Sequence, residues 1–152
     1  MNSKYMDEAI KEAKAAAKAE EVPVGAVVVL NGEVIASEHN RCEELSDPTE
    51  HAEMRAIRSA CKKINNFRLN GAEIYVTMEP CPMCAGAIIS ARISEVVFGA
   101  YDPVKGALGS VCNLYENKFP VKAEIFSGVR EKECKEILTE FFKKQRQKSA
   151  KE

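Results

Sequence analysis

Apolar residues recur every three or four positions in three stretches of the chain, which is the spacing of an amphipathic helix. The first stretch lies within the opening twenty residues, the second follows Thr49, and the third lies near the C-terminus. The three apolar stripes are Met6, Ala9, Ile10, Ala13, Ala16 and Ala17; Met54, Ile57, Cys61 and Ile64; and Cys134, Ile137, Leu138, Phe141 and Phe142. We therefore expect three helices, with Thr49 as the residue that caps the second one.

Runs of β-branched, aromatic and other apolar residues between these stripes predict five strands. Residues 22–30 form the longest apolar run, interrupted by Pro23 and Gly25, and it indicates a strand that is buried on both faces. The pair Asn31-Gly32 is a strong hairpin signal, and it should join this strand antiparallel to residues 33–39. The other strands are expected at 74–78, 96–100 and 123–127.

The remaining segments predict a further helix and two irregular connections. Pro80 and Pro82 mark a turn from the third strand into a helix over residues 82–91, because proline is well tolerated in the first turn of a helix. Residues 40–48 should form a loop. Residues 101–120 form a long connection that contains glycine, and such connections often line a pocket.

The alternation of strands and helices after an initial hairpin predicts a layered α/β domain, with a mostly parallel sheet covered by helices on both faces. In such sheets the functional site lies where strands lead into helices. The length of 152 residues suits a single domain over 1–152. Residues 143–152 are rich in lysine and should form a basic, partly disordered tail.

Composition narrows the class of protein. Hydrophobic residues make up 45% and charged residues 30% of the chain, as in folded proteins that live in water. The longest apolar run is too short to cross a bilayer, and the N-terminus lacks the apolar stretch of an export signal. We therefore expect a cytoplasmic protein with no membrane partner, in which the six cysteines are thiols and not disulfides. The net charge of −1 indicates that any basic surface is local.

Four residues combine into a candidate metal centre. The sequence reads His51-Ala52-Glu53 and, after an intervening strand, Pro80-Cys81-Pro82-Met83-Cys84. Imidazole and thiolate groups are the preferred ligands of zinc, and three protein ligands leave one position for water, as in catalytic zinc sites. His51 and Glu53 do not share a helix face, so they converge only if the start of the helix points at the site. We expect His51, Cys81 and Cys84 to bind zinc beside Glu53.

Other interpretations of the same residues are weaker. The Cys-x-x-Cys pair could be a redox dithiol, but His51 and Glu53 would then have no task. The site would be structural if a further cysteine completed it, and Cys42 is the candidate to check. The combination of both motifs favours a catalytic zinc site.

The sequence resembles the tRNA-specific adenosine deaminase family (TadA) within the cytidine deaminase-like superfamily, and the resemblance covers nearly the whole chain. The His-x-Glu and Pro-Cys-x-x-Cys pattern is shared by the superfamily. The narrower resemblance lies in residues 22–27, 47–53, 80–87, 96–100, 106–110 and 140–144.

This resemblance implies a three-layer α/β/α cytidine deaminase-like fold with a five-stranded mixed sheet and helices on both faces. It also implies one Zn²⁺ per subunit and hydrolytic deamination of adenosine to inosine at the wobble position of a tRNA anticodon. Water would attack C6 of the adenine, while Glu53 would move protons from the water to N1 and to the departing amine. The shared motif also admits a free nucleobase deaminase acting on guanine or cytosine. A scaffold without activity is disfavoured by Glu53.

The resemblance further implies contacts with the partner, a tRNA anticodon stem-loop. Asn40 would hold the splayed nucleotide, Asp102 would contact the RNA backbone or sugar, and Phe142 would help to hold the anticodon stem together with Lys143, Lys144 and Arg146. Asn40 and Asp102 also suit turns, and a basic helix end also suits the helix dipole. Family members form homodimers, so a homodimer is expected here too.

Overall fold

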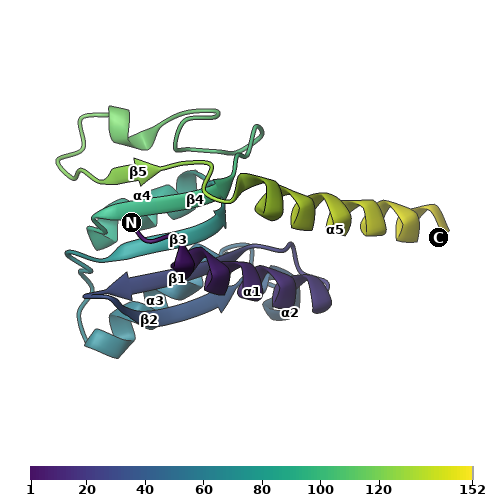
Figure 1. Cartoon of the computed structure of the whole chain (residues 1–152), viewed down its shortest axis with the longest axis horizontal. Coiled ribbons are helices and arrows are strands. Elements are labelled where there is room, and N and C mark those ends of the chain that lie inside the picture. Colours follow the sequence, from purple (N-terminus) through teal and green to yellow (C-terminus); the bar gives the residue numbers. More distant parts are fainter. Residues whose placement is uncertain (152) are drawn as a thin grey trace.

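The computed structural model describes residues 1–151, and it shows a five-stranded sheet between two layers of helices (Figure 1). The strands are β1 (Gly25–Leu30), β2 (Glu33–His39), β3 (Glu73–Met78), β4 (Glu95–Ala100) and β5 (Glu124–Phe126). The long helices are α1 (Lys4–Lys18), α3 (Ala52–Ile64), α4 (Pro82–Ala91) and α5 (Glu131–Lys151). A short helix α2 (Cys42–Leu45) and a 3₁₀ turn (Leu114–Glu116) lie in the two segments expected to be irregular.

The sheet is mixed, with the strand order β2-β1-β3-β4-β5. β1 is antiparallel to both of its neighbours, whereas β3, β4 and β5 run parallel. Four of the five strands run in one direction, as expected for a mostly parallel sheet, but two of the four strand pairings are antiparallel. The reason is that β1 lies between β2 and β3. The five-stranded mixed sheet implied by the family resemblance is confirmed. The crossover through α3 joins two strands of the same direction that are not neighbours.

The initial hairpin forms as the sequence predicts. Leu30 pairs with Glu33 across the turn, and both intervening residues have positive φ, 52° for Asn31 and 76° for Gly32. Asparagine and glycine are the residues that tolerate this left-handed backbone, and the resulting turn matches the twist of the strands.

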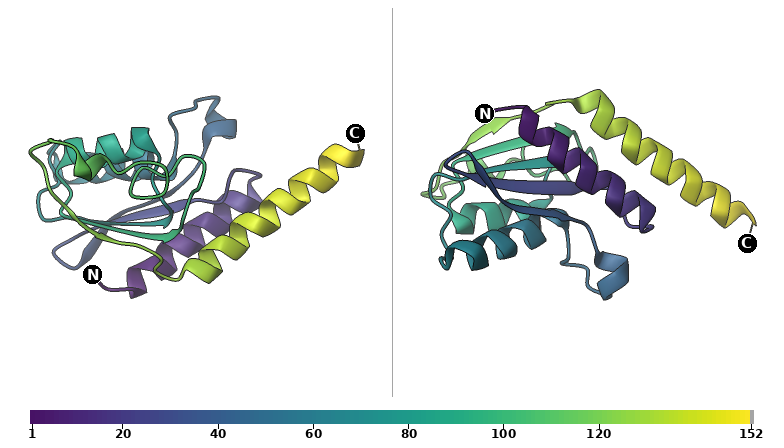
Figure 2. Two further views of the ribbon diagram at one scale, coloured as in Figure 1. Left: turned by 90° about the horizontal axis from the view of Figure 1, so that it is seen from above. Right: turned by 60° about the horizontal axis from the view of Figure 1, so that its bottom comes forward.

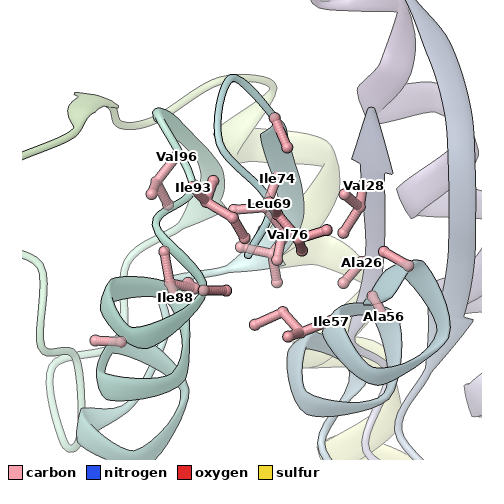
Figure 3. Close-up of a cluster of buried hydrophobic side chains, with 14 of the residues drawn as sticks. Ala26, Val28, Ala56, Ile57, Leu69, Ile74, Val76, Ile88, Ile93 and Val96 are labelled. Atoms are coloured by element: carbon pink, nitrogen blue, oxygen red, sulfur yellow. The ribbon is translucent and has the colours of Figure 1, made fainter. Parts of the chain in front are cut away.

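The two faces of the sheet are covered by different helices (Figure 2). Side chains at alternate strand positions point to opposite faces. Val28, Ile74 and Val76 therefore pack against α3 and α4, and Figure 3 shows this core. Val27, Tyr75 and Val97 pack with buried residues of α1 and α5 on the other face. The three-layer arrangement confirms the expectation of helices on both faces.

Two local expectations differ from the structure. Thr49 does not cap α3: its hydroxyl donates to Asp47 Oδ1 (2.7 Å), and the N-cap position belongs to His51. Residues 143–151 are not a disordered tail but the last turns of α5, while Glu152 lies outside the described residues. The lysine-rich end therefore projects from the domain as a helix (Figure 1).

The length and apolar content of the helices decide whether any of them could span a membrane. Among residues 1–151, no helix combines the length and the apolar character that a bilayer span requires.

Candidate active site

The candidate site lies where two helices begin. His51 occupies the N-cap position of α3, and Glu53 follows in its first turn. Cys81 occupies the N-cap position of α4, and Cys84 lies in the first turn of that helix. Pro82 at the start of α4 has the preset φ that suits this position. The helix starts thus bring together the residues that the sequence pattern predicts to meet.

The three expected metal ligands lie close enough to share one ion. His51 Nδ1 is 3.7 Å from Cys81 Sγ and 3.4 Å from Cys84 Sγ. One ligand atom from each residue lies within 4.8 Å of the others. Neighbouring ligands of a tetrahedral zinc ion with bond lengths of about 2.0–2.3 Å are separated by about 3.3–3.8 Å. The donor set and its spacing therefore fit a zinc ion.

Cys42 does not belong to this group. Among the described residues 1–151, the ligand cluster at this site comprises His51, Cys81 and Cys84. The Cys42 thiol instead donates to Asn40 Oδ1 at 3.3 Å. Three protein ligands leave a coordination position for water.

The charge balance of the two thiols also favours a cation. The pKa of Cys81 is lowered to about 4, first because Cys84 donates to it and then because His51 does. The same contact and burial raise the pKa of Cys84. The protein alone thus stabilises one thiolate of the pair. A divalent cation between the sulfurs supplies the positive charge that stabilises both.

Glu53 lies beside the ligands and is almost completely buried, with 4% of its surface exposed. Burial is the largest influence on this side chain, and it raises the pKa of Glu53 to about 7. A carboxyl group with a pKa near neutrality can both accept and donate a proton at pH 7.

A cleft of about 520 Å³ opens above these residues. Its lining includes His51, Glu53 and Cys81 as well as the three residues expected to contact substrate: Asn40, Asp102 and Phe142. Phe142 lies on α5, far along the chain from Asn40, which follows β2. The structure thus brings all the predicted substrate residues to one cleft, while their contacts with RNA remain predictions.

The environments of Asn40 and Asp102 differ. Asn40 is 7% exposed at the end of β2, where its backbone N–H donates to Val24. The Asp102 carboxylate accepts the backbone N–H groups of Val104 and Lys105 (3.0 and 3.1 Å). The turn interpretation of Asp102 is therefore present in the structure, and any contact with substrate would be additional.

The sequence analysis missed several residues of this cleft. Val22 and Val104 are exposed apolar side chains on its lining, and Lys105 adds a positive charge. Glu79 is a buried carboxylate at the end of β3, directly before Pro80. A charged residue at the end of a buried strand was the signal available for Glu79, since such a group needs partners.

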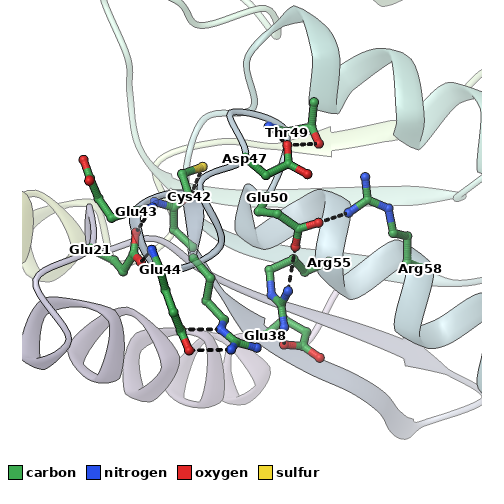
Figure 4. Close-up of polar contacts among 12 residues, drawn as sticks. Glu21, Glu38, Cys42, Glu43, Glu44, Asp47, Thr49, Glu50, Arg55 and Arg58 are labelled. Atoms are coloured by element: carbon green, nitrogen blue, oxygen red, sulfur yellow. Dashed lines mark hydrogen bonds and ion pairs between the residues drawn. The ribbon is translucent and has the colours of Figure 1, made fainter.

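An ionic network holds the segment that leads into His51 (Figure 4). Arg55 on α3 donates to Glu50 at 2.6 Å and to Glu38 on β2 at 3.1 Å. Arg58 binds the other carboxylate oxygen of Glu50 at 2.8 Å. The backbone carbonyl of Glu50 accepts the N–H of Arg41. The network therefore fixes the residue before His51 against both α3 and β2.

We expect Arg55→Met to lower the free energy of unfolding by about 1–3 kcal/mol, because two partly buried carboxylates lose their shared donor. The matched control is Arg58→Met. The Arg58 side chain is 45% exposed, and removal of an exposed pair should cost about 1 kcal/mol or less. Urea unfolding of both zinc-loaded variants measures the difference, and equal losses would contradict the assigned importance of Arg55.

The fold and the site together define a class of protein. Strand-to-helix junctions that carry His-x-Glu and Pro-Cys-x-x-Cys at a shared cleft are typical of the cytidine deaminase-like proteins. A family model described as MafB19-like deaminase matches residues 1–146.

Comparison with individual proteins narrows the class. A tRNA-specific adenosine deaminase of Bacillus subtilis is 52% identical over 145 residues, which cover 95% of this chain and 90% of that protein. A solved structure of a tRNA:A34 deaminase, from work on A-to-I editing at the wobble position of transfer RNA, is 44% identical with a TM-score of 0.84. The match covers 90% of this chain and 100% of the solved chain. The chain belongs to the family of tRNA-specific adenosine deaminases.

A more distant structure represents the free-base enzymes. Guanine deaminase from Bacillus subtilis is 32% identical with a TM-score of 0.63, and the match covers 79% of this chain and 88% of that one. Both the sequence identity and the structural similarity are lower than for the tRNA:A34 deaminase.

Proposed function

We propose that this protein uses one Zn²⁺ per subunit to deaminate adenosine to inosine at the wobble position of a tRNA anticodon. One observation carries the proposal: His51, Cys81 and Glu53 line one cleft, with Cys84 clustered beside them, in a chain that is 52% identical to a tRNA-specific adenosine deaminase. His51, Cys81 and Cys84 would hold the zinc. When bound, zinc lowers the pKa of water to about 7 and so provides a nucleophile at neutral pH.

Glu53 has the position for the proton transfers of this reaction. It takes a proton from the attacking water and gives one to N1 of the adenine. It then accepts the remaining proton of the new C6 hydroxyl and passes it to the amino group, which leaves C6 as ammonia while the C6 carbonyl forms. Its burial in the cleft, away from bulk water, keeps these protons between enzyme and substrate.

The cleft also suits a nucleotide that has left its stack. Asn40 at the end of β2 offers an amide for hydrogen bonds to the base and sugar, and Phe142 offers an exposed aromatic ring on the cleft lining. The basic end of α5, with Lys143, Lys144 and Arg146, would contact phosphates of the anticodon stem. With such a substrate the protein works in the cytoplasm. We expect the protein to act as a homodimer. Light scattering tests this, and the measured mass should be twice that of one chain.

The experiment that tests the proposed function is incubation of the zinc-loaded protein with an unmodified tRNA that carries a wobble adenosine. Free guanine and free cytosine are assayed in parallel. We expect stoichiometric conversion of the adenosine to inosine and no turnover of the free bases. Rapid deamination of guanine or cytosine with the tRNA left intact would refute the proposal in favour of the free-base alternative.

A further inference from the structure

Glu79 is a buried charge next to the metal motif that the proposed chemistry does not use. It is 3% exposed and lies between Met78 of β3, which lines the cleft, and the Pro80-Cys81 pair. An ionised carboxylate is costly to bury unless hydrogen bonds replace its water. Its partners therefore indicate what it is for.

Within residues 1–151, the Glu79 carboxylate receives all of its hydrogen bonds from one loop. Oε1 accepts the backbone N–H of Asp102 at 3.1 Å and the hydroxyl of Ser110 at 2.5 Å. Oε2 accepts the backbone N–H groups of Leu108 and Ser110, both at 3.1 Å. Residues 102–110, hereafter the 102–110 loop, are thus gathered around a single side chain.

The same loop forms one wall of the catalytic cleft, through Asp102, Pro103, Val104 and Lys105. A backbone bond from Ala107 N to the carbonyl of Pro80 (2.9 Å) ties it to the metal motif as well. Gly106 permits the close approach, because a Cβ there would lie 2.4 Å from the Glu79 carboxylate. The loop is therefore built around Glu79.

We propose that Glu79 is a positioning residue that fixes the substrate-binding wall of the cleft relative to the metal ligand Cys81. This inference rests on the proposed function. Because Glu79 follows β3 directly and Cys81 comes two residues later, one short rigid segment sets both the metal ligand and the loop. Loss of the carboxylate releases the wall and leaves the three metal ligands in place.

The test compares Glu79→Gln with the zinc-loaded wild type. Gln keeps the shape but replaces one of the two acceptor oxygens by a donor that faces N–H groups. We expect KM for the tRNA to rise roughly 10-fold or more, with kcat changed by less than about threefold and zinc retained. Backbone amides of the 102–110 loop should exchange hydrogen faster in the variant.

Two further variants keep the test decisive. Ser110→Ala removes a single bond to Glu79 and should shift KM and exchange in the same direction by less. Tyr75→Phe removes two partly buried hydrogen bonds of another β3 residue, away from the cleft: the Tyr75 hydroxyl donates to Glu73 at 2.6 Å and accepts the Asn2 N–H at 2.9 Å. It should lower stability and leave KM and the exchange of the 102–110 loop unchanged.

The outcomes separate this inference from the proposed function. If Glu79→Gln lowers the melting temperature but leaves KM and the exchange of the 102–110 loop unchanged, Glu79 only stabilises the fold and the inference is wrong. Loss of zinc from this variant would also overturn it. If the wild type converts no tRNA, the proposed function fails, while hydrogen exchange still decides whether Glu79 holds the loop.

Discussion

Glu53→Ala is expected to reduce kcat for tRNA deamination by at least about 10²- to 10⁴-fold, the usual contribution of a general acid or base. The variant should retain zinc and bind tRNA normally, because Glu53 is not among the three clustered ligand residues. Single-turnover conversion of the tRNA, metal content and a tRNA binding titration measure the three quantities separately.

The comparison needs an isosteric variant and a control. Glu53→Gln keeps the size of the buried side chain but cannot accept the water's proton, so it should be nearly as inactive as Glu53→Ala. Glu44→Gln changes an exposed carboxylate that is bound to Arg41, and it should leave kcat unchanged. Activity of Glu53→Gln close to that of the wild type would refute the assigned role.

Cys84→Ala should abolish both zinc binding and activity. Two remaining ligands, His51 and Cys81, hold zinc far more weakly than three. Loss of a metal that binds only the folded chain also lowers the free energy of unfolding. Metal analysis after dialysis and thermal unfolding with and without added zinc measure both effects.

Cys134→Ala is the matched control for the loss of a buried thiol. Cys134 is 1% exposed on α5 and packs on the opposite face of the sheet. Its replacement should cost about 1 kcal/mol of stability and leave the zinc content and the activity intact. Retention of zinc by Cys84→Ala, or its loss from Cys134→Ala, would show that the ligands have been misassigned.

Local sequence signals were sufficient to predict much of this molecule. The helical stripes, the Asn31-Gly32 hairpin and the buried strands each depend on neighbouring residues, and all formed as predicted. The metal cluster could be predicted because His-x-Glu and Cys-x-x-Cys restrict the chemistry so strongly.

Features that depend on distant parts of the chain were harder to predict. No local pattern shows that β1 lies between β2 and β3. The sequence therefore did not predict the second antiparallel pairing, between β1 and β3. Thr49 has the residue type of a helix cap, but its hydroxyl binds Asp47, and His51 occupies the N-cap position of α3. Only the family resemblance indicated that Phe142 contacts the substrate, and its position on the cleft lining required the fold. The role proposed for Glu79 could be inferred only once the position of the 102–110 loop was known.

The account depends most on the identity of the metal's first coordination shell. X-ray absorption at the zinc edge on the purified protein measures that shell directly. We predict two sulfur neighbours at about 2.3 Å and two nitrogen or oxygen neighbours at about 2.0–2.1 Å, one from His51 and one from water. A shell with three or four sulfurs, or with none, would contradict an open site formed by His51, Cys81 and Cys84.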